Sequence, residues 1–193
     1  YQVALDAAEA SAAASRPVRG ELLLAKGDAQ ILGGDGPAAR ETLLRTAAVA
    51  KADGDADLFG RAALAYGGRD IWGPRQEWDA RYTPLLEEAL AMSGEQDSVV
   101  RARLLTRLAS AMRGSPDRQL LESLAVDAYE IAERLGDRST VLYALDGRLA
   151  ATGGPATAEA RFRDGAKLME LATEAGDLER IFGAHEHVLY TSW

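Results

Sequence analysis

Residues 117–137 read DRQLLESLAVDAYEIAERLGD, and this stretch decides the fold class. Its apolar side chains recur every three or four residues, which places them on one side of an α-helix. That side is formed by Leu121, Leu124, Ala125, Ala128, Ile131 and Leu135. Gly136 then ends the helix, because glycine adopts the left-handed capping conformation at little cost. Asp137 can cap the next helix, so the stretch predicts a helix, a tight corner and a second helix.

The same corner recurs about every 40 residues, as expected of a helical repeat. Its copies are at residues 52–55, 93–97, 135–137 and 175–177, and they close on Asp55, Asp97, Asp137 and Asp177. A looser break within each period, at residues 33–37, 67–74, 114–117 and 153–155, has glycine after one helix and proline near the next. Each period therefore holds two helices, which we expect near residues 2–14, 18–33, 37–52, 57–69, 79–92, 98–113, 117–135, 139–151, 156–175 and 179–191.

The composition supports a fold made only of helices. Alanine, leucine, arginine and glutamate dominate the chain, and no stretch alternates apolar and polar residues long enough for a strand. A single helix pair cannot bury its apolar side, so neighbouring pairs must stack. We therefore expect an all-α fold, a right-handed α-solenoid of about five antiparallel helix pairs that forms one repeat domain over residues 1–193. Because the sequence begins at Tyr1 and stops within an apolar run, we interpret it as a fragment of a larger multidomain protein.

The charge of the chain argues against nucleic acid as a partner. It carries 22 Lys and Arg against 30 Asp and Glu, a formal net charge of −8, whereas a domain that follows a phosphate backbone is basic. Cysteine is absent, which excludes disulfides and thiolate metal sites and suits a reducing compartment. No run approaches the roughly 20 apolar residues that span a bilayer. We therefore expect a cytoplasmic segment that binds neither nucleic acid nor membrane.

No pattern in the chain indicates catalysis. None of its lysines, Lys26, Lys51 and Lys167, is followed by Ser or Thr, so the signature of a phosphate-binding loop is missing. His185 and His187 are two residues apart, which turns them roughly 200° from each other on a helix and disfavours a shared metal ion. We expect His185 in a core position and His187 on a polar side. Most carboxylates fall on predicted solvent faces near arginine, so we expect no enzyme, no metal and no cofactor in this segment.

The connection from Arg69 to Tyr82 is the first candidate binding region. It brings Trp72, Trp78 and Tyr82 together with arginines, including Arg69, between two predicted helices. Tryptophan and arginine dominate binding hot spots, and long loops in compact arrays are often functional. The alternative is that both tryptophans wedge between neighbouring helix pairs and cover the end of the core.

A second candidate is the polar side of the first helix in each pair. We expect this side to line the concave surface, where solenoids bind partners, and to carry Arg61, Arg103 and Arg107. The alternative is ordinary solvated arginine. Arg148 falls at a position that is otherwise apolar in the repeats, so we expect it to pair with a buried acid.

Several blocks of the sequence resemble a known repeat family. Helical runs at residues 21–30, 38–44, 84–90, 101–109 and 144–148 look like tetratricopeptide hairpins, although their period departs from the usual length of about 34 residues. In their order they resemble the helical-repeat region of large ATP-binding transcription regulators of the LuxR family, actinobacterial proteins similar in layout to MalT. The resemblance implies a nucleotide-binding module before this segment and a helix-turn-helix after it, so ATP is expected only in the neighbouring module. It also implies that the repeats sense an effector or protein partner and control self-association.

Two alternatives to such a regulator stay open at this point. The first alternative is a stand-alone protein-binding scaffold. The second is the sensory domain of a signalling protein, which would enclose a small ligand. In each case we expect self-association through apolar residues near the C-terminal end, Leu189, Tyr190 and Trp193, because a solenoid needs a polar cap.

Overall fold

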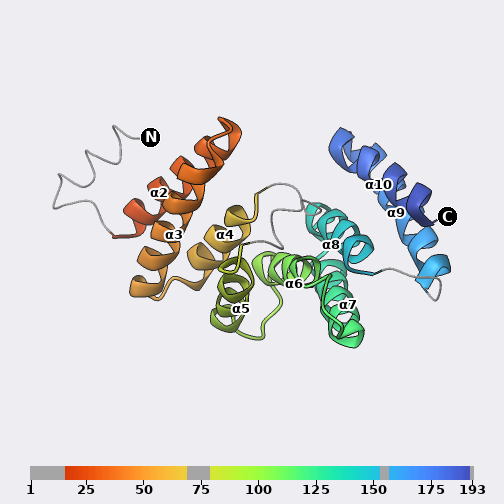
Figure 1. Cartoon of the computed structure of the whole chain (residues 1–193), viewed down its shortest axis with the longest axis horizontal. Coiled ribbons are helices and arrows are strands. Elements are labelled where there is room, and N and C mark those ends of the chain that lie inside the picture. The colour runs from red at the N-terminus through yellow and green to blue at the C-terminus, as the bar shows by residue number, and fades with distance from the viewer. Residues whose placement is uncertain (1–15, 69–78, 153–156, 192–193) are drawn as a thin grey trace. The chain divides into compact units, whose positions relative to one another are not determined.

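The computed structural model describes residues 16–68, 79–152 and 157–191, and within these ranges every regular element is an α-helix (Figure 1). The helices are α2 (Arg16–Leu32), α3 (Gly36–Asp53), α4 (Ala56–Tyr66), α5 (Tyr82–Met92), α6 (Val99–Ala111), α7 (Arg118–Leu135), α8 (Arg138–Ala151), α9 (Ala158–Ala175) and α10 (Leu178–Thr191). The all-α prediction is confirmed, and the predicted boundaries agree with these helices to within about three residues. The helix predicted at residues 2–14 lies outside the described residues.

The glycine and aspartate corners form as the sequence predicts. Gly54, Gly136 and Gly176 end their helices in the left-handed conformation, with φ of 70°, 66° and 67°. The aspartate that follows each of them accepts a hydrogen bond from a backbone N–H three residues on, with lengths of 3.0 Å at Leu58, 2.9 Å at Thr140 and 3.1 Å at Arg180. These bonds satisfy donors that the first helical turn leaves without a partner.

One corner departs from the prediction. Ser98, and not Asp97, caps α6, because the Ser98 hydroxyl oxygen accepts the bond from the Arg101 N–H at 3.1 Å. The Asp97 carboxylate instead binds Arg134 near the end of α7, with 2.6 Å between Oδ2 and Nε. The expected cap at Asp97 is therefore wrong by one residue, because an arginine from a later helix holds that carboxylate.

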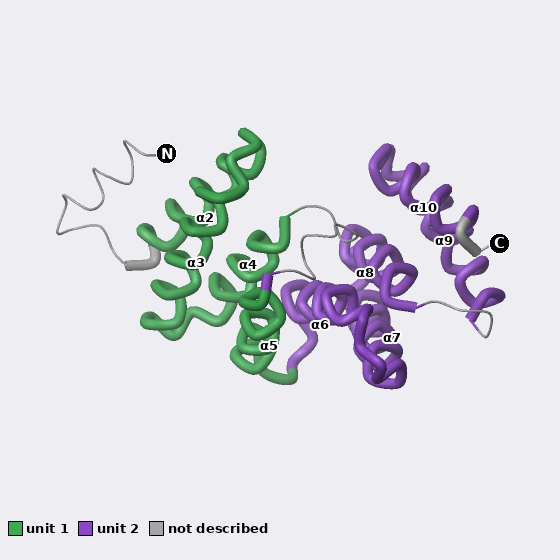
Figure 2. Tube along the Cα trace, in the orientation of Figure 1, with its two compact units in different colours: residues 1–70, 80–95 green, residues 71–79, 96–193 purple. Residues whose placement is uncertain are grey.

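The chain divides into two compact units, residues 1–70 with 80–95 and residues 71–79 with 96–193 (Figure 2). In unit 1, α2, α3 and α4 pack on one another, and α5 packs on α4. Its largest buried side chains are Leu23, Leu43, Leu58, Phe59, Tyr82 and Leu86. Gly27 lets α2 approach α3 closely, because a Cβ at this position would lie 2.7 Å from a methyl carbon of Leu43.

In unit 2, helices that follow each other in sequence pack together from α6 to α10, and α8 also contacts both α6 and α10. The core is built from Leu104, Leu105, Leu121, Leu145, Leu149 and Leu168. Gly147 sets the distance between α6 and α8, since a Cβ there would lie 2.0 Å from Cγ2 of Thr106. Contact between every second helix is the pattern expected of stacked helix pairs. A single repeat domain over residues 1–193 stays a prediction.

Among the described residues, none of the helices combines the length and the apolar character needed to cross a membrane.

Candidate functional site

The predicted binding residues of the connection before α5 divide into two groups. Arg69, Trp72 and Trp78 lie outside the described residues. Tyr82 lies in the core of unit 1, where it is 1% exposed and stacks on Tyr66 with 5.9 Å between ring centroids. Tyr82 therefore offers no surface to a partner, contrary to the sequence interpretation, because the Tyr66 ring and the core of the unit cover it.

The two arginines predicted on α6 meet at one tyrosine of α8. The Cζ atoms of Arg103 and Arg107 lie 5.5 and 5.7 Å from the centroid of the Tyr143 ring. Arg180 of α10 reaches the same ring, with its Cζ atom 5.9 Å from the centroid. We refer to Arg103, Arg107, Tyr143 and Arg180 as the arginine–tyrosine cluster. Its guanidinium groups are attracted to the π-system of the ring, a contact worth roughly 0.5–2 kcal/mol depending on exposure.

Arg107 is the buried member of the cluster and contacts the Tyr143 hydroxyl. Its side chain is 2% exposed, and its Nε–H donates a hydrogen bond to the Tyr143 hydroxyl. A buried guanidinium is tolerated only when it is hydrogen-bonded. Arg107 thus positions Tyr143 and, being buried, does not itself line a surface, which corrects its predicted role as a surface residue.

Arg103 and Arg180 form the more exposed part of the cluster. Arg103 donates from Nη2 to the Ser139 hydroxyl at 3.0 Å, and Arg180 pairs with Asp177. The Nε–H groups of both arginines are buried and find no acceptor among the described residues. A buried donor without an acceptor costs about 1–3 kcal/mol, which favours a rearrangement of these two side chains toward an anionic group that binds here.

Hydrogen bonds lower the pKa of two acids beside the cluster. The hydrogen bond from the Thr140 hydroxyl, together with the Thr140 N–H and the charge of Arg103, lowers the pKa of Asp137. Burial opposes ionisation of Asp177, but hydrogen bonds from Arg180 outweigh it and lower the pKa of that carboxyl group as well. The three arginines of the cluster therefore lie beside two ionised carboxylates, in a chain whose net charge is −8.

Tyr143 and Arg180 are the cluster residues that the sequence interpretation missed. Both lie in the first two turns of the helix that follows a glycine–aspartate corner, as Arg103 does in α6. That shared place in the repeat is the signal that could have found them. Arg61, the third arginine predicted on this side of the repeats, instead forms ion pairs with Glu21 and Asp57 in unit 1.

The two histidines are placed the other way round from the prediction. His187 is 2% exposed, and its Nε2 lies 3.2 Å from a carboxylate oxygen of Asp146 on α8, whereas His185 is exposed. The buried side of α10 carries Ala184 and, one turn later, His187. The contact of α10 with α8 therefore buries His187, and the sequence alone did not indicate which histidine would face α8.

Arg148 pairs with an acid of unit 2, as predicted. Its Nε lies 2.8 Å from Oδ2 of Asp164, and both side chains are largely buried, at 21% and 16% exposure. Its Cζ atom also lies 4.6 Å from the centroid of the Tyr129 ring. This group stabilises the contact of α8 with α9. The Nε–H of Arg148 has an acceptor in Asp164, whereas those of Arg103 and Arg180 have none among the described residues.

Compared with models of known protein families and with curated proteins, the chain matches none.

Proposed function

We propose that this chain is a helical-repeat interaction and regulatory domain, a right-handed α-solenoid of about five antiparallel helix pairs. The contacts of α2 with α4, and of α8 with α6 and α10, support stacked pairs. Under this proposal α6, α8 and α10 are the first helices of their pairs and line the inner surface, where solenoids bind partners.

The arginine–tyrosine cluster is the observation that carries the proposal. It places three guanidinium groups, two from α6 and one from α10, within 6 Å of one ring of α8, in a chain of net charge −8. Guanidinium N–H groups match carboxylate geometry, and arginine and tyrosine are common hot-spot residues. The partner is therefore an acidic segment of another protein, whose carboxylates accept hydrogen bonds from the half-exposed guanidinium groups of Arg103 and Arg180.

A comparison of partners tests this function. Three tagged forms of the protein are expressed in the native host: wild type, an Arg103→Gln, Arg180→Gln double variant, and Arg118→Gln. The last is a control that removes one charge from the exposed start of α7. We expect a protein with an acidic segment to be recovered with wild type and with Arg118→Gln, but not with the double variant. Equal recovery with all three would contradict the proposal, and stabilisation by inorganic phosphate or a small dicarboxylate alone would favour the small-ligand alternative.

We infer from the sequence resemblance that the parent is an ATP-dependent, LuxR-type transcriptional activator of the cytoplasm. Binding at the repeats would then change the arrangement of the flanking modules, which hold ATP and DNA. The native coding region on both sides of this segment tests the assignment. A Walker motif upstream and a helix-turn-helix downstream support it, and the absence of both leaves a stand-alone scaffold.

Self-association is part of the proposed function and is assigned to α10. Leu178, Phe182 and Leu189 are 79%, 66% and 62% exposed there. Apolar residues gathered on one exposed helix favour contact with another apolar surface. Light scattering at high concentration should detect a dimer that Phe182→Glu dissociates, and a wild-type monomer would contradict this assignment.

A further inference from the structure

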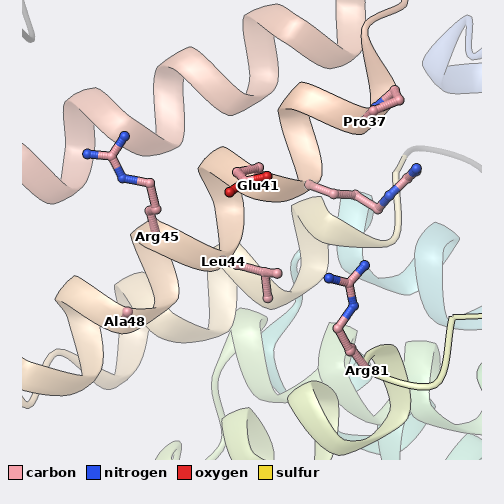
Figure 3. A pocket seen from close by; sticks show the side chains of 7 residues that line it. Pro37, Glu41, Leu44, Arg45, Ala48 and Arg81 are labelled. Carbon is pink, nitrogen blue, oxygen red and sulfur yellow. The ribbon is translucent and has the colours of Figure 1, made fainter.

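A second surface of the molecule, in unit 1, has features of a binding site. An open groove of about 440 Å³ runs beside α3 (Figure 3). It is lined by Pro37, Arg40, Glu41, Leu44, Arg45 and Ala48 of α3 and by Arg81, which directly precedes α5. We call this surface the α3 groove. Its residues on α3 span three turns, a length of about 16 Å at 1.5 Å per residue.

The α3 groove lies on the side of α3 that faces away from the core of unit 1. The opposite side of the helix carries Ala39, Leu43 and Ala47, which are at most 3% exposed and belong to the core. Helix α3 contacts α2 and α4. Leu44 is half-buried and Ala48 is exposed, so an apolar stripe remains accessible along the groove.

Positive charge flanks this apolar stripe. Three arginines face one glutamate in the groove, although acids outnumber bases in the whole chain by 30 to 22. Arg40 is half-buried, and among the described residues it has no hydrogen-bond or ion-pair partner. Arg81 is held in place by the core, since its Cζ atom lies 5.9 Å from the centroid of the Tyr66 ring. Figure 3 shows its side chain reaching from the start of α5 toward α3.

The positions of the arginines indicate an elongated ligand. Arg40 and Arg45 are five residues apart, which places them about 140° from each other around the helix axis. Pro37, Leu44 and Ala48 fall between them on the same side of the helix. The two arginines therefore lie on opposite edges of the stripe and do not converge on a single small anion.

We propose that the α3 groove docks an amphipathic helix of a partner protein, with an apolar stripe over Leu44 and Ala48 and acidic residues on both flanks. An amphipathic helix laid in a groove buries anchors at i, i+3, i+4 and i+7, and Pro37, Leu44 and Ala48 offer a matching stripe with spacings of seven and four residues. Glutamates on its flanks would meet Arg40 and Arg81 on one side and Arg45 on the other. This surface belongs to unit 1, so the inference does not depend on the arginine–tyrosine cluster.

The test uses a labelled synthetic helix of about 15 residues, with leucine on one stripe and glutamate on both flanks, and the whole chain as receptor. Fluorescence anisotropy at low salt should show saturable binding. We expect the Arg40→Gln, Arg81→Gln variant to weaken it by about tenfold, and Ala48→Glu to weaken it at least as much through charge repulsion. Ala48 is exposed and Arg40 has no partner among the described residues, so circular dichroism should show an unchanged fold for Ala48→Glu and for Arg40→Gln alone. Because Arg81 also contacts the Tyr66 ring, Arg40→Gln alone serves as the second variant and should weaken binding by at least about threefold.

Two controls separate specific docking from general attraction of charge. Arg118→Gln removes a charge from unit 2 and should leave affinity within about twofold of wild type, whereas a peptide with glutamine in place of glutamate should bind about tenfold more weakly. No saturable binding, or equal weakening by Arg118→Gln, would overturn the proposal. Displacement of the peptide by equimolar inorganic phosphate would also overturn it in favour of a small-anion site.

Discussion

Replacing Gly147 with alanine perturbs the contact that brings α6 and α8 together. The added Cβ would lie 2.0 Å from Cγ2 of Thr106, whereas carbon atoms in contact are about 3.5–4.0 Å apart. Thr106 is 1% exposed, and its hydroxyl donates to the Ala102 carbonyl at 2.9 Å, so its side chain cannot rotate away without losing that bond. The helices must therefore move apart.

The magnitude follows from two opposing effects. Overpacking of this kind costs about 1–3 kcal/mol, while replacing glycine by alanine within a helix returns up to about 1 kcal/mol. We expect Gly147→Ala to lower the free energy of unfolding by about 1–2 kcal/mol. Because α6 carries Arg103 and α8 carries Tyr143, the same displacement should also weaken partner binding at the cluster.

Urea unfolding followed by circular dichroism measures the effect, and a double-mutant cycle isolates its cause. Thr106→Ser removes the clashing methyl group and should cost about 1 kcal/mol alone, yet it should raise the stability of Gly147→Ala. Gly183→Ala is the matched control, since a Cβ there meets nothing closer than an Asp146 oxygen at 3.9 Å, and it should stabilise slightly. Additive effects of Gly147→Ala and Thr106→Ser, to within about 0.5 kcal/mol, would refute the reasoning.

Three further predictions concern corners and ion pairs. Gly54 has φ of 70° with open space around it, so Gly54→Ala should cost about 1 kcal/mol through backbone strain alone, measured by urea unfolding. The folded pKa of Asp137 is lowered chiefly by the Thr140 hydroxyl, so its contribution to stability is present above the unfolded pKa and is lost as pH falls through the folded pKa. Asp137→Asn should therefore have a lower free energy of unfolding than wild type near neutral pH. In a pH series of unfolding curves, this difference in stability should shrink below about pH 4. Arg148→Gln should cost about 2 kcal/mol by leaving the Asp164 carboxylate without its cation, and Asp164→Asn should restore part of that loss in the double variant.

The helices were predictable because the signals that define them are local. A glycine that reaches the left-handed conformation and an aspartate that caps the next turn need only their own neighbours in sequence, as at Gly136 and Asp137. Ser98 was missed as a cap because Asp97 is an equally good capping residue. The choice between them depends on Arg134, which is 37 residues away.

The candidate site was predictable only in part for a related reason. The spacing of polar residues on α6 was enough to select Arg103 and Arg107 for one side of the helix. Their convergence on Tyr143, together with Arg180, arises from the packing of α6 and α10 against α8. The periodicity of one helix does not show which residues of the neighbouring helices contact that helix. The burial of Arg107 depends on the same packing between helices and was missed for this reason.

The most direct test of the proposed function observes the arginine Nε–H groups themselves while an acidic ligand is added. In isotope-labelled protein, their NMR signals can be assigned from the Arg103→Gln and Arg180→Gln variants and followed during titration with a tetraglutamate peptide. We predict saturable shifts of Arg103 and Arg180 with no comparable change at Arg118, which is exposed at the start of α7. Equal, non-saturating shifts of all three signals, or none at Arg103 and Arg180, would contradict the assignment of the arginine–tyrosine cluster as the partner-binding site.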